Sequence, residues 1–246
     1  MKEDYSPEIE GVQPYQHSYR WVMLGLVSFL YCCFNMILSS ISPLVTPIIR
    51  DLGISFSQMG IILGAWQLAF IGVATIGGAI IDRWGIRNSL FVGIIIMSLS
   101  AVLRYYVYGF KTLFLCVALF GLGAPMVSIG APKTIALWFR GKSRATAVGI
   151  YTASVWIGVL LGFSLTNSVV MPLTGYSWRL TFVCYGLVAM IAALLWWFLA
   201  RNVNVSTAKE SESAFEVFRN LVSIRTVRLV LIIGFISTLI THGFNN

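Results

Sequence analysis

Apolar residues in this chain gather into long runs that short polar segments separate. A helix needs about 20 mostly apolar residues to cross the hydrocarbon core of a bilayer, and runs of this length recur along the sequence. The pattern therefore predicts an all-α membrane protein. Six complete spans are expected at residues 20–42, 57–80, 88–108, 112–136, 146–171 and 178–200.

Beyond the sixth span the pattern changes. Phe215, Phe218 and Val222 lie in a long polar stretch and have the spacing of an amphipathic surface helix, although a solvated linker also fits. A further apolar run begins near residue 227 and is barely long enough to cross a bilayer before Asn246. The expected organisation is a cytoplasmic tail over 1–18, a six-helix bundle over 19–200, a cytoplasmic linker over 201–226 and an incomplete seventh helix over 227–246.

The composition agrees with lipid as the main solvent. Of the 246 residues, 58% are hydrophobic and 11% are charged, whereas soluble domains carry about 25% charged residues. The net charge of +8 comes from basic residues in the short gaps between apolar runs, which is unlike a nucleic-acid-binding surface. No metal-ligand spacing and no catalytic constellation occurs at membrane depth, so neither a cofactor, nor a metal, nor enzymatic activity is expected.

The basic residues are divided unequally between the two sides of the membrane. Most of them fall in the N-terminal tail and in the segments that follow the second, fourth and sixth spans. Because Lys and Arg favour the cytoplasmic side, the sequence predicts a multi-pass protein of the cell membrane with a cytoplasmic N-terminus. Trp21 and Trp138 then lie near the inner interface and Tyr106 and Trp178 near the outer one, as in an aromatic belt.

The connection between the second and third spans is short and charged. Gly85 supplies the backbone freedom of a tight turn, and Gly78 is expected to let its helix approach a neighbour closely. Asp82 lies at the end of its helix, where a negative charge opposes the helix dipole and needs a positive partner. Arg83 and Arg87 are expected to hold the connection on the anionic inner leaflet.

This stretch resembles the loop motif of the major facilitator superfamily, which reads G-x-x-x-D-R-x-G-R-R-x-x-L in outline. The residues that match in register are Gly78, Asp82, Arg83, Gly85, Arg87 and Leu90. Ile86 replaces a basic residue of the motif. The resemblance implies the N-terminal half of a twelve-helix transporter, whose six helices form a 3+3 inverted repeat and whose partner is the missing C-terminal half.

Two further stretches are similar to family members. The connection before the fifth span, from Trp138 to Gly149, has the family pattern, and this similarity implies that Arg144 associates with Asp82 as part of a cytoplasmic gating motif. Residues 130–139 look like the cyanate-permease and related anion-porter branch. This resemblance implies that the transported solute is a small anion.

The chain also departs from the family. Many proton-coupled members carry an arginine four residues before a G-x-G in the fourth span, and Val117 stands there. Gly158 is followed by Val159 where the antiporter motif has proline. None of the nine acidic residues lies in the middle of an expected span, so this half offers no buried carboxylate as a proton relay.

Polar and aromatic residues at mid-depth are candidates for a substrate cavity between the two halves. They are Tyr31, Asn35, Trp66, Gln67, Tyr151 and Trp156, and each could instead make a helix-packing contact. Lys133 could either extend toward the inner interface or face the cavity and attract an anion. Arg104 lies near the outer end of its span and is expected to extend toward the outer interface.

These observations predict a secondary transporter that moves a small solute, an organic or inorganic anion, across the lipid bilayer by alternating access. A membrane receptor or sensor that binds a ligand without transport is the alternative of another class. A truncated, inactive fragment of a transporter is the third reading, because a cavity needs both of its walls.

Overall fold

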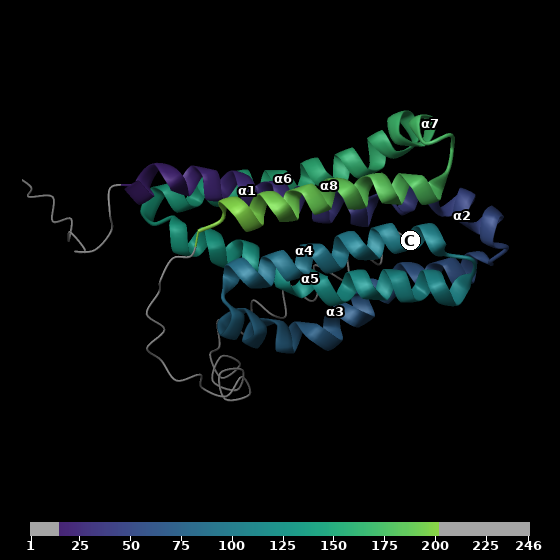
Figure 1. Ribbon diagram of the computed structural model, residues 1–246, viewed down its shortest axis with the longest axis horizontal. Coiled ribbons are helices and arrows are strands. Elements are labelled where there is room, and N and C mark those ends of the chain that lie inside the picture. Colours follow the sequence, from purple (N-terminus) through teal and green to yellow (C-terminus); the bar gives the residue numbers. More distant parts are fainter. Residues whose placement is uncertain (1–14, 202–246) are drawn as a thin grey trace, which may run out of the picture. The chain divides into compact units, whose positions relative to one another are not determined.

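The computed structural model describes residues 15–201, which form helices separated by short connections (Figure 1). The elements are α1 (Tyr15–Ser39), η1 (Ser42–Leu44), α2 (Val45–Leu52), α3 (Phe56–Trp84), α4 (Ile86–Leu103), η2 (Arg104–Tyr106), α5 (Phe110–Trp138), α6 (Gly141–Leu165), η3 (Thr166–Val170), α7 (Met171–Leu173) and α8 (Trp178–Leu199). Residues 15–201 contain six segments that are long and apolar enough to cross a membrane.

The six predicted spans are confirmed, and several are longer than the apolar pattern indicated. The helix expected over 57–80 runs on through the charged residues to Trp84, and the one expected from 146 begins at Gly141. Polar residues at a membrane surface do not interrupt backbone hydrogen bonding, so hydropathy alone ends a helix too early. The expected seventh helix and most of the tail and linker lie outside the described residues.

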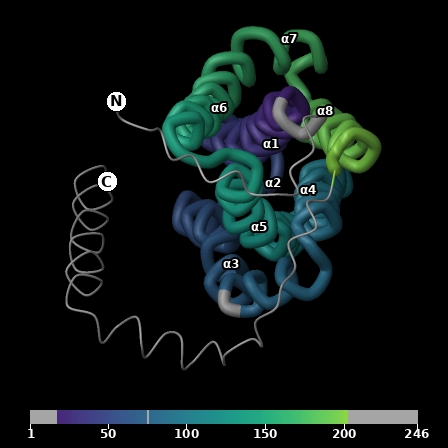
Figure 2. The backbone as a smooth tube through the Cα atoms, turned by 90° about the vertical axis from the view of Figure 1, so that its left-hand side faces the viewer, coloured from purple at the N-terminus to yellow at the C-terminus, as the bar shows by residue number. Residues whose placement is uncertain are grey.

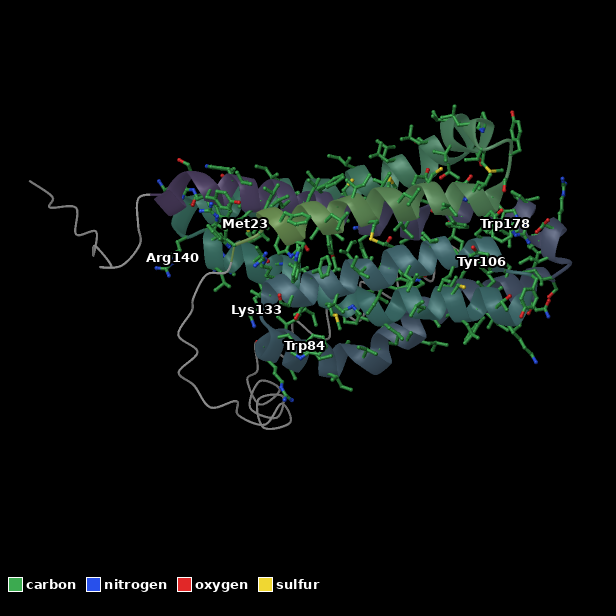
Figure 3. The ribbon with its side chains drawn as sticks, in the orientation of Figure 1. Met23, Trp84, Tyr106, Lys133, Arg140 and Trp178 are labelled. Carbon is green, nitrogen blue, oxygen red and sulfur yellow. The ribbon has the colours of Figure 1, made fainter. Side chains whose placement is uncertain are left out.

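The spans lie lengthwise beside one another and create two distinct ends. Figure 3 places Trp84, Lys133 and Arg140 toward one end, and Tyr106 and Trp178 toward the other. We call the first the motif end, because the connection between α3 and α4 lies there. We call the second the far end. It holds the connections between α2 and α3, between η2 and α5, and between α7 and α8.

The first three spans are α1, α3 and α4, and the last three are α5, α6 and α8. The middle helix of each group packs against a helix of the other group. Viewed from one end, α6, α1, α5 and α3 follow one another, with α4 and α8 to the side (Figure 2). The main contacts join α3 to α5 and α6 to α1, while α4 packs between α5 and α8. Since each group has three spans, the second group starts from the opposite end, which is the arrangement of a 3+3 inverted repeat.

Small residues bring the central helices together. A Cβ atom built on Gly158 of α6 would lie 2.4 Å from the backbone oxygen of Cys32 in α1. Gly93 of α4 and Gly123 of α5 oppose each other in the same way, since a Cβ on Gly123 would lie 2.5 Å from the oxygen of Gly93. Close backbone approach of this kind supplies the packing that holds helices together in lipid.

Arg179 ties the three far-end connections together. Its Nη1 lies 2.5 Å from the carboxylate of Asp51 at the end of α2, and its Nη2 donates to the backbone oxygen of Val107 over 2.8 Å. Its guanidinium also lies 4.4 Å from the ring centre of Trp178. Because the indole of Trp178 donates to Asp51 as well, the end of α2, the end of η2 and the start of α8 are joined through one charged cluster.

Candidate functional site

The turn between α3 and α4 depends on Gly85. Its φ of +79° is a left-handed conformation that glycine adopts at little cost, which confirms the predicted need for backbone freedom. The close helix approach expected at Gly78 is wrong, because no atom lies within 4 Å of a Cβ built there. The preceding Gly77 makes that approach instead, with the Cβ of Pro125 in α5 only 3.1 Å away.

Arg87 fastens the start of α4 to the end of α8. Its Nη2 donates to the backbone oxygen of Trp197 over 2.5 Å, and its guanidinium lies 5.0 Å from the centre of that ring. In return the indole of Trp196 donates to the backbone oxygen of Arg87 over 2.9 Å. Arg87 thus makes a helix-end contact, in which a cation caps the negative end of a helix dipole, and its expected contact with the inner leaflet stays a prediction. Arg83 remains exposed.

Asp82 pairs with Lys133 of α5 in an ion pair and hydrogen bond. The association of Asp82 with Arg144 that the family resemblance implied is not formed, because Arg144 lies one turn into α6 with an exposed side chain. Lys133 therefore turns toward the motif end and does not face a mid-depth cavity. The predicted need of Asp82 for an external cation is confirmed, with a different partner.

The Asp82–Lys133 pair is expected to contribute less than about 1 kcal/mol to stability, because the two side chains are 65% and 42% exposed. A double-mutant cycle of Asp82→Asn and Lys133→Gln, measured by thermal unfolding in detergent, should give a small favourable coupling energy. The matched cycle of Asp82→Asn with Arg144→Gln should give none. Equal coupling in the two cycles would contradict the assigned pairing.

Three of the predicted cavity residues join a continuous series of aromatic rings. Tyr151 of α6 lies 5.0 Å from Tyr31 of α1, which stacks on Phe34 at 5.4 Å. Phe34 stacks in turn on Phe120 of α5 at 5.5 Å, and Phe120 meets Trp66 of α3 edge-on at 6.5 Å. These rings link the four helices α6, α1, α5 and α3, so Tyr31, Trp66 and Tyr151 lie in one connected layer.

The other predicted cavity residues are not part of this series of rings. Asn35 is 7% exposed, and its amide donates to the backbone oxygen of Tyr31 on its own helix. It packs beside Gly158 where α1 and α6 meet. Gln67 of α3 and Trp156 of α6 are exposed, and Trp156 shows 69% of its surface. Asn35 thus serves helix packing, whereas Gln67 and Trp156 stay available for contacts outside residues 15–201.

A cavity of about 280 Å³ opens beside the aromatic layer, toward the far end. It is lined by Ile37, Leu38, Ser39, Ile41, Ser42, Leu63, Trp66, Arg104, Val117 and Phe120. Its walls are mainly apolar, with a few polar groups, as in small-molecule sites. Trp66 is the one predicted cavity residue among them.

Arg104 is the functional candidate that the sequence reading placed wrongly. It is only 2% exposed and lines the cavity, whereas the sequence predicted extension to the outer interface. Its guanidinium lies 4.4 Å from the centre of the Phe182 ring in α8. Position along a span gives depth but not the direction around the helix. One feature of the sequence pointed to this cavity. Val117 stands where many family members carry an arginine, and Val117 lines the same cavity.

The sequence from residue 27 to 245 matches the family model described as Major Facilitator Superfamily. The chain belongs to the Major Facilitator Superfamily. Membership in this superfamily and the six apolar helices make it an integral membrane protein. The family model thus agrees with the sequence motif between α3 and α4. It also agrees with the six-helix bundle and its inverted repeat.

Two similar proteins are named as transporters of hexuronate and of L-galactonate. The chain is 29% identical over 188 residues to the hexuronate transporter of Bacillus subtilis (strain 168), covering 76% of this chain and 44% of that protein. It is 31% identical over 166 residues to the probable L-galactonate transporter of Escherichia coli (strain K12), covering 67% of this chain and 36% of that protein. The chain therefore spans less than half the length of these relatives.

A solved structure shows the same fold. The bacterial homologue of the human lysosomal transporter Spinster, in its inward-facing and occupied conformation, superposes with a TM-score of 0.68 at 23% sequence identity. The superposition covers 81% of this chain and 48% of that protein. The fold of this chain is therefore that of one half of a superfamily transporter.

Proposed function

We propose that the protein is a secondary transporter of small organic anions, of the sugar-acid class, and that this chain forms one of its two bundles. The observation that carries the proposal is the similarity to the hexuronate transporter over 76% of the chain. A second observation supports it. The residues 15–201 contain a cavity of suitable size with a buried cation on its wall.

Alternating access requires a second bundle opposite this one. The face formed by α6, α1, α5 and α3 suits that role, because its outer helices are little covered. In the most apolar stretch of the α3 span and of the α6 span, only 17% of the residues are buried. The corresponding share is 61% in the first span and 56% in α5. We expect the second bundle to cover α3 and α6 and to contact Gln67 and Trp156.

The proposal is tested by uptake into proteoliposomes that contain the product of the whole reading frame. Radiolabelled D-glucuronate should accumulate, and unlabelled L-galactonate should compete with it. D-glucose is the matched control, because it has the same ring but no carboxylate. Equal uptake of glucose and glucuronate, or no uptake of any sugar acid, would contradict the proposed substrate class.

We also propose that the motif end faces the cytoplasm, as the distribution of Lys and Arg predicts. In intact cells, Arg83→Cys at the motif end should resist a membrane-impermeant thiol reagent, and Lys111→Cys at the far end should react. Both measurements need a background without the native exposed Cys184. The reverse labelling pattern would overturn this orientation.

A further inference from the structure

Residues 15–201 bury one arginine inside the bundle without a carboxylate beside it. Arg104 follows α4 at the far end, and its Nε and Nη1 are enclosed and lack a hydrogen-bond partner among the described residues. A buried donor that lacks a hydrogen-bond partner is unfavourable, and more so when the group is charged. The Phe182 ring offsets part of this cost through a cation–π contact.

No acidic side chain of this segment can neutralise Arg104. Between residues 15 and 201 the sequence contains two carboxylates, Asp51 and Asp82. Asp51 is engaged with Arg179 at the far end, and Asp82 pairs with Lys133 at the motif end. A buried charge without a partner is strongly unfavourable, so the positive charge at Arg104 calls for an anion from outside this segment.

The surroundings of Arg104 fit an anion of small size. Arg104 is one of the residues that line the cavity of about 280 Å³, which is at the small end of the range for ligand sites. Ser39, Ser42 and Trp66 belong to the same lining, although the Ser39 hydroxyl donates to the backbone oxygen of Asn35. A planar guanidinium suits carboxylates and other oxyanions because two of its N–H groups can bind two oxygens at once.

We propose that the cavity beside Arg104 is an oxyanion-binding site, in which the guanidinium binds the carboxylate of the transported solute. This inference rests on the proposed function for the choice of a carboxylate. The shared chemistry is a small oxyanion, and an inorganic ion such as phosphate is the second source of it. Arg104 serves as the counter-charge, the apolar walls exclude water, and the Trp66 ring packs against the remainder of the solute.

The test is ligand-dependent thermal stabilisation of the purified protein in detergent, because a ligand that binds only the folded state raises the melting temperature. The probes are sodium D-glucuronate, sodium phosphate and D-glucose at equal ionic strength. Wild-type protein should be stabilised by glucuronate and not by glucose. Arg104→Gln should bind glucuronate at least about tenfold more weakly, and Arg104→Lys should keep part of the affinity.

Two further variants separate binding from folding. Lys111→Gln removes one positive charge from an exposed residue at the same end, and it should bind glucuronate as the wild type does. Val117→Phe keeps Arg104 but fills the cavity, so it should weaken binding even if Arg104→Gln does not fold. Unchanged affinity in Val117→Phe, or in a folded Arg104→Gln, would overturn the site.

The outcomes distinguish this site from the proposed function. Uptake of glucuronate together with unchanged binding in Arg104→Gln would support the proposed transport function and reject the oxyanion site at Arg104. Stabilisation of the wild type by phosphate alone, lost in Arg104→Gln, would retain the oxyanion site and reject the carboxylate solute. The absence of stabilisation by either anion in the wild type would overturn the oxyanion site.

Discussion

Replacing Trp196 with alanine is expected to destabilise the bundle by about 3–5 kcal/mol, the usual cost of removing a large buried aromatic side chain. Trp196 is 1% exposed and is the largest of the fully buried side chains among residues 15–201. Its indole also donates to the backbone oxygen of Arg87, so the substitution removes a hydrogen bond at the start of α4. The turn that carries the family motif should loosen together with the end of α8.

The measurement is thermal or denaturant unfolding in detergent, followed by tryptophan fluorescence and size-exclusion chromatography. Phe198→Ala is the matched control, because Phe198 lies two residues further along α8 and is 76% exposed. It should change the stability by less than about 1 kcal/mol. Trp196→Phe should fall between the two, since it keeps most of the packing but loses the donor. Equal stability of the Trp196→Ala and Phe198→Ala proteins would show that Trp196 is not buried as described.

The second large effect is expected from Gly158→Ala in α6. The added methyl group would lie 2.4 Å from the backbone oxygen of Cys32 and 3.0 Å from the Cβ of Asn35. A backbone oxygen cannot move aside as a flexible side chain can, so α6 and α1 must separate. Overpacking of this kind costs about 1–3 kcal/mol, which exceeds the gain of up to about 1 kcal/mol from replacing glycine in a helix.

Gly149→Ala on the same helix provides the control. No atom lies within 4 Å of a Cβ built on Gly149, so only the helix-propensity gain should remain, and the protein should be as stable as the wild type or slightly more so. The melting temperatures of the two variants should therefore shift in opposite directions or differ by several degrees. A Gly158→Ala protein as stable as the Gly149→Ala protein would refute the close approach of α1 and α6.

Much of the fold could be predicted from the sequence, because apolar length and charge distribution act along the chain. The six spans, the glycine turn at Gly85 and the membrane class depend on local properties of this kind. The error at Gly78 has a clear origin. Two adjacent glycines differ by about 100° around a helix axis, and only the packed structure shows that Gly77 faces α5.

The candidate site was predicted less well, because it depends on which way each side chain points. Trp66 could be recognised as an aromatic residue at mid-depth, and it does line the cavity. Arg104 was assigned to the outer interface from its depth, although the helix turns it inward toward Val117 and Phe182. Lys133 was a candidate anion ligand in the sequence, but in the structure it forms an ion pair with Asp82 of α3. Contacts between helices therefore decide the roles of these charged residues.

The exchange of middle helices between the two groups has a consequence for biogenesis. The principal neighbour of α1 is α6 and that of α3 is α5, so the earliest spans find their main partners only among later ones. While the ribosome is still delivering the chain, α1 and α3 enter the bilayer with their packing faces uncovered. A nascent protein halted after its third span would therefore offer those faces to the insertion machinery and to surrounding lipid, and it would lack the contacts that complete the bundle.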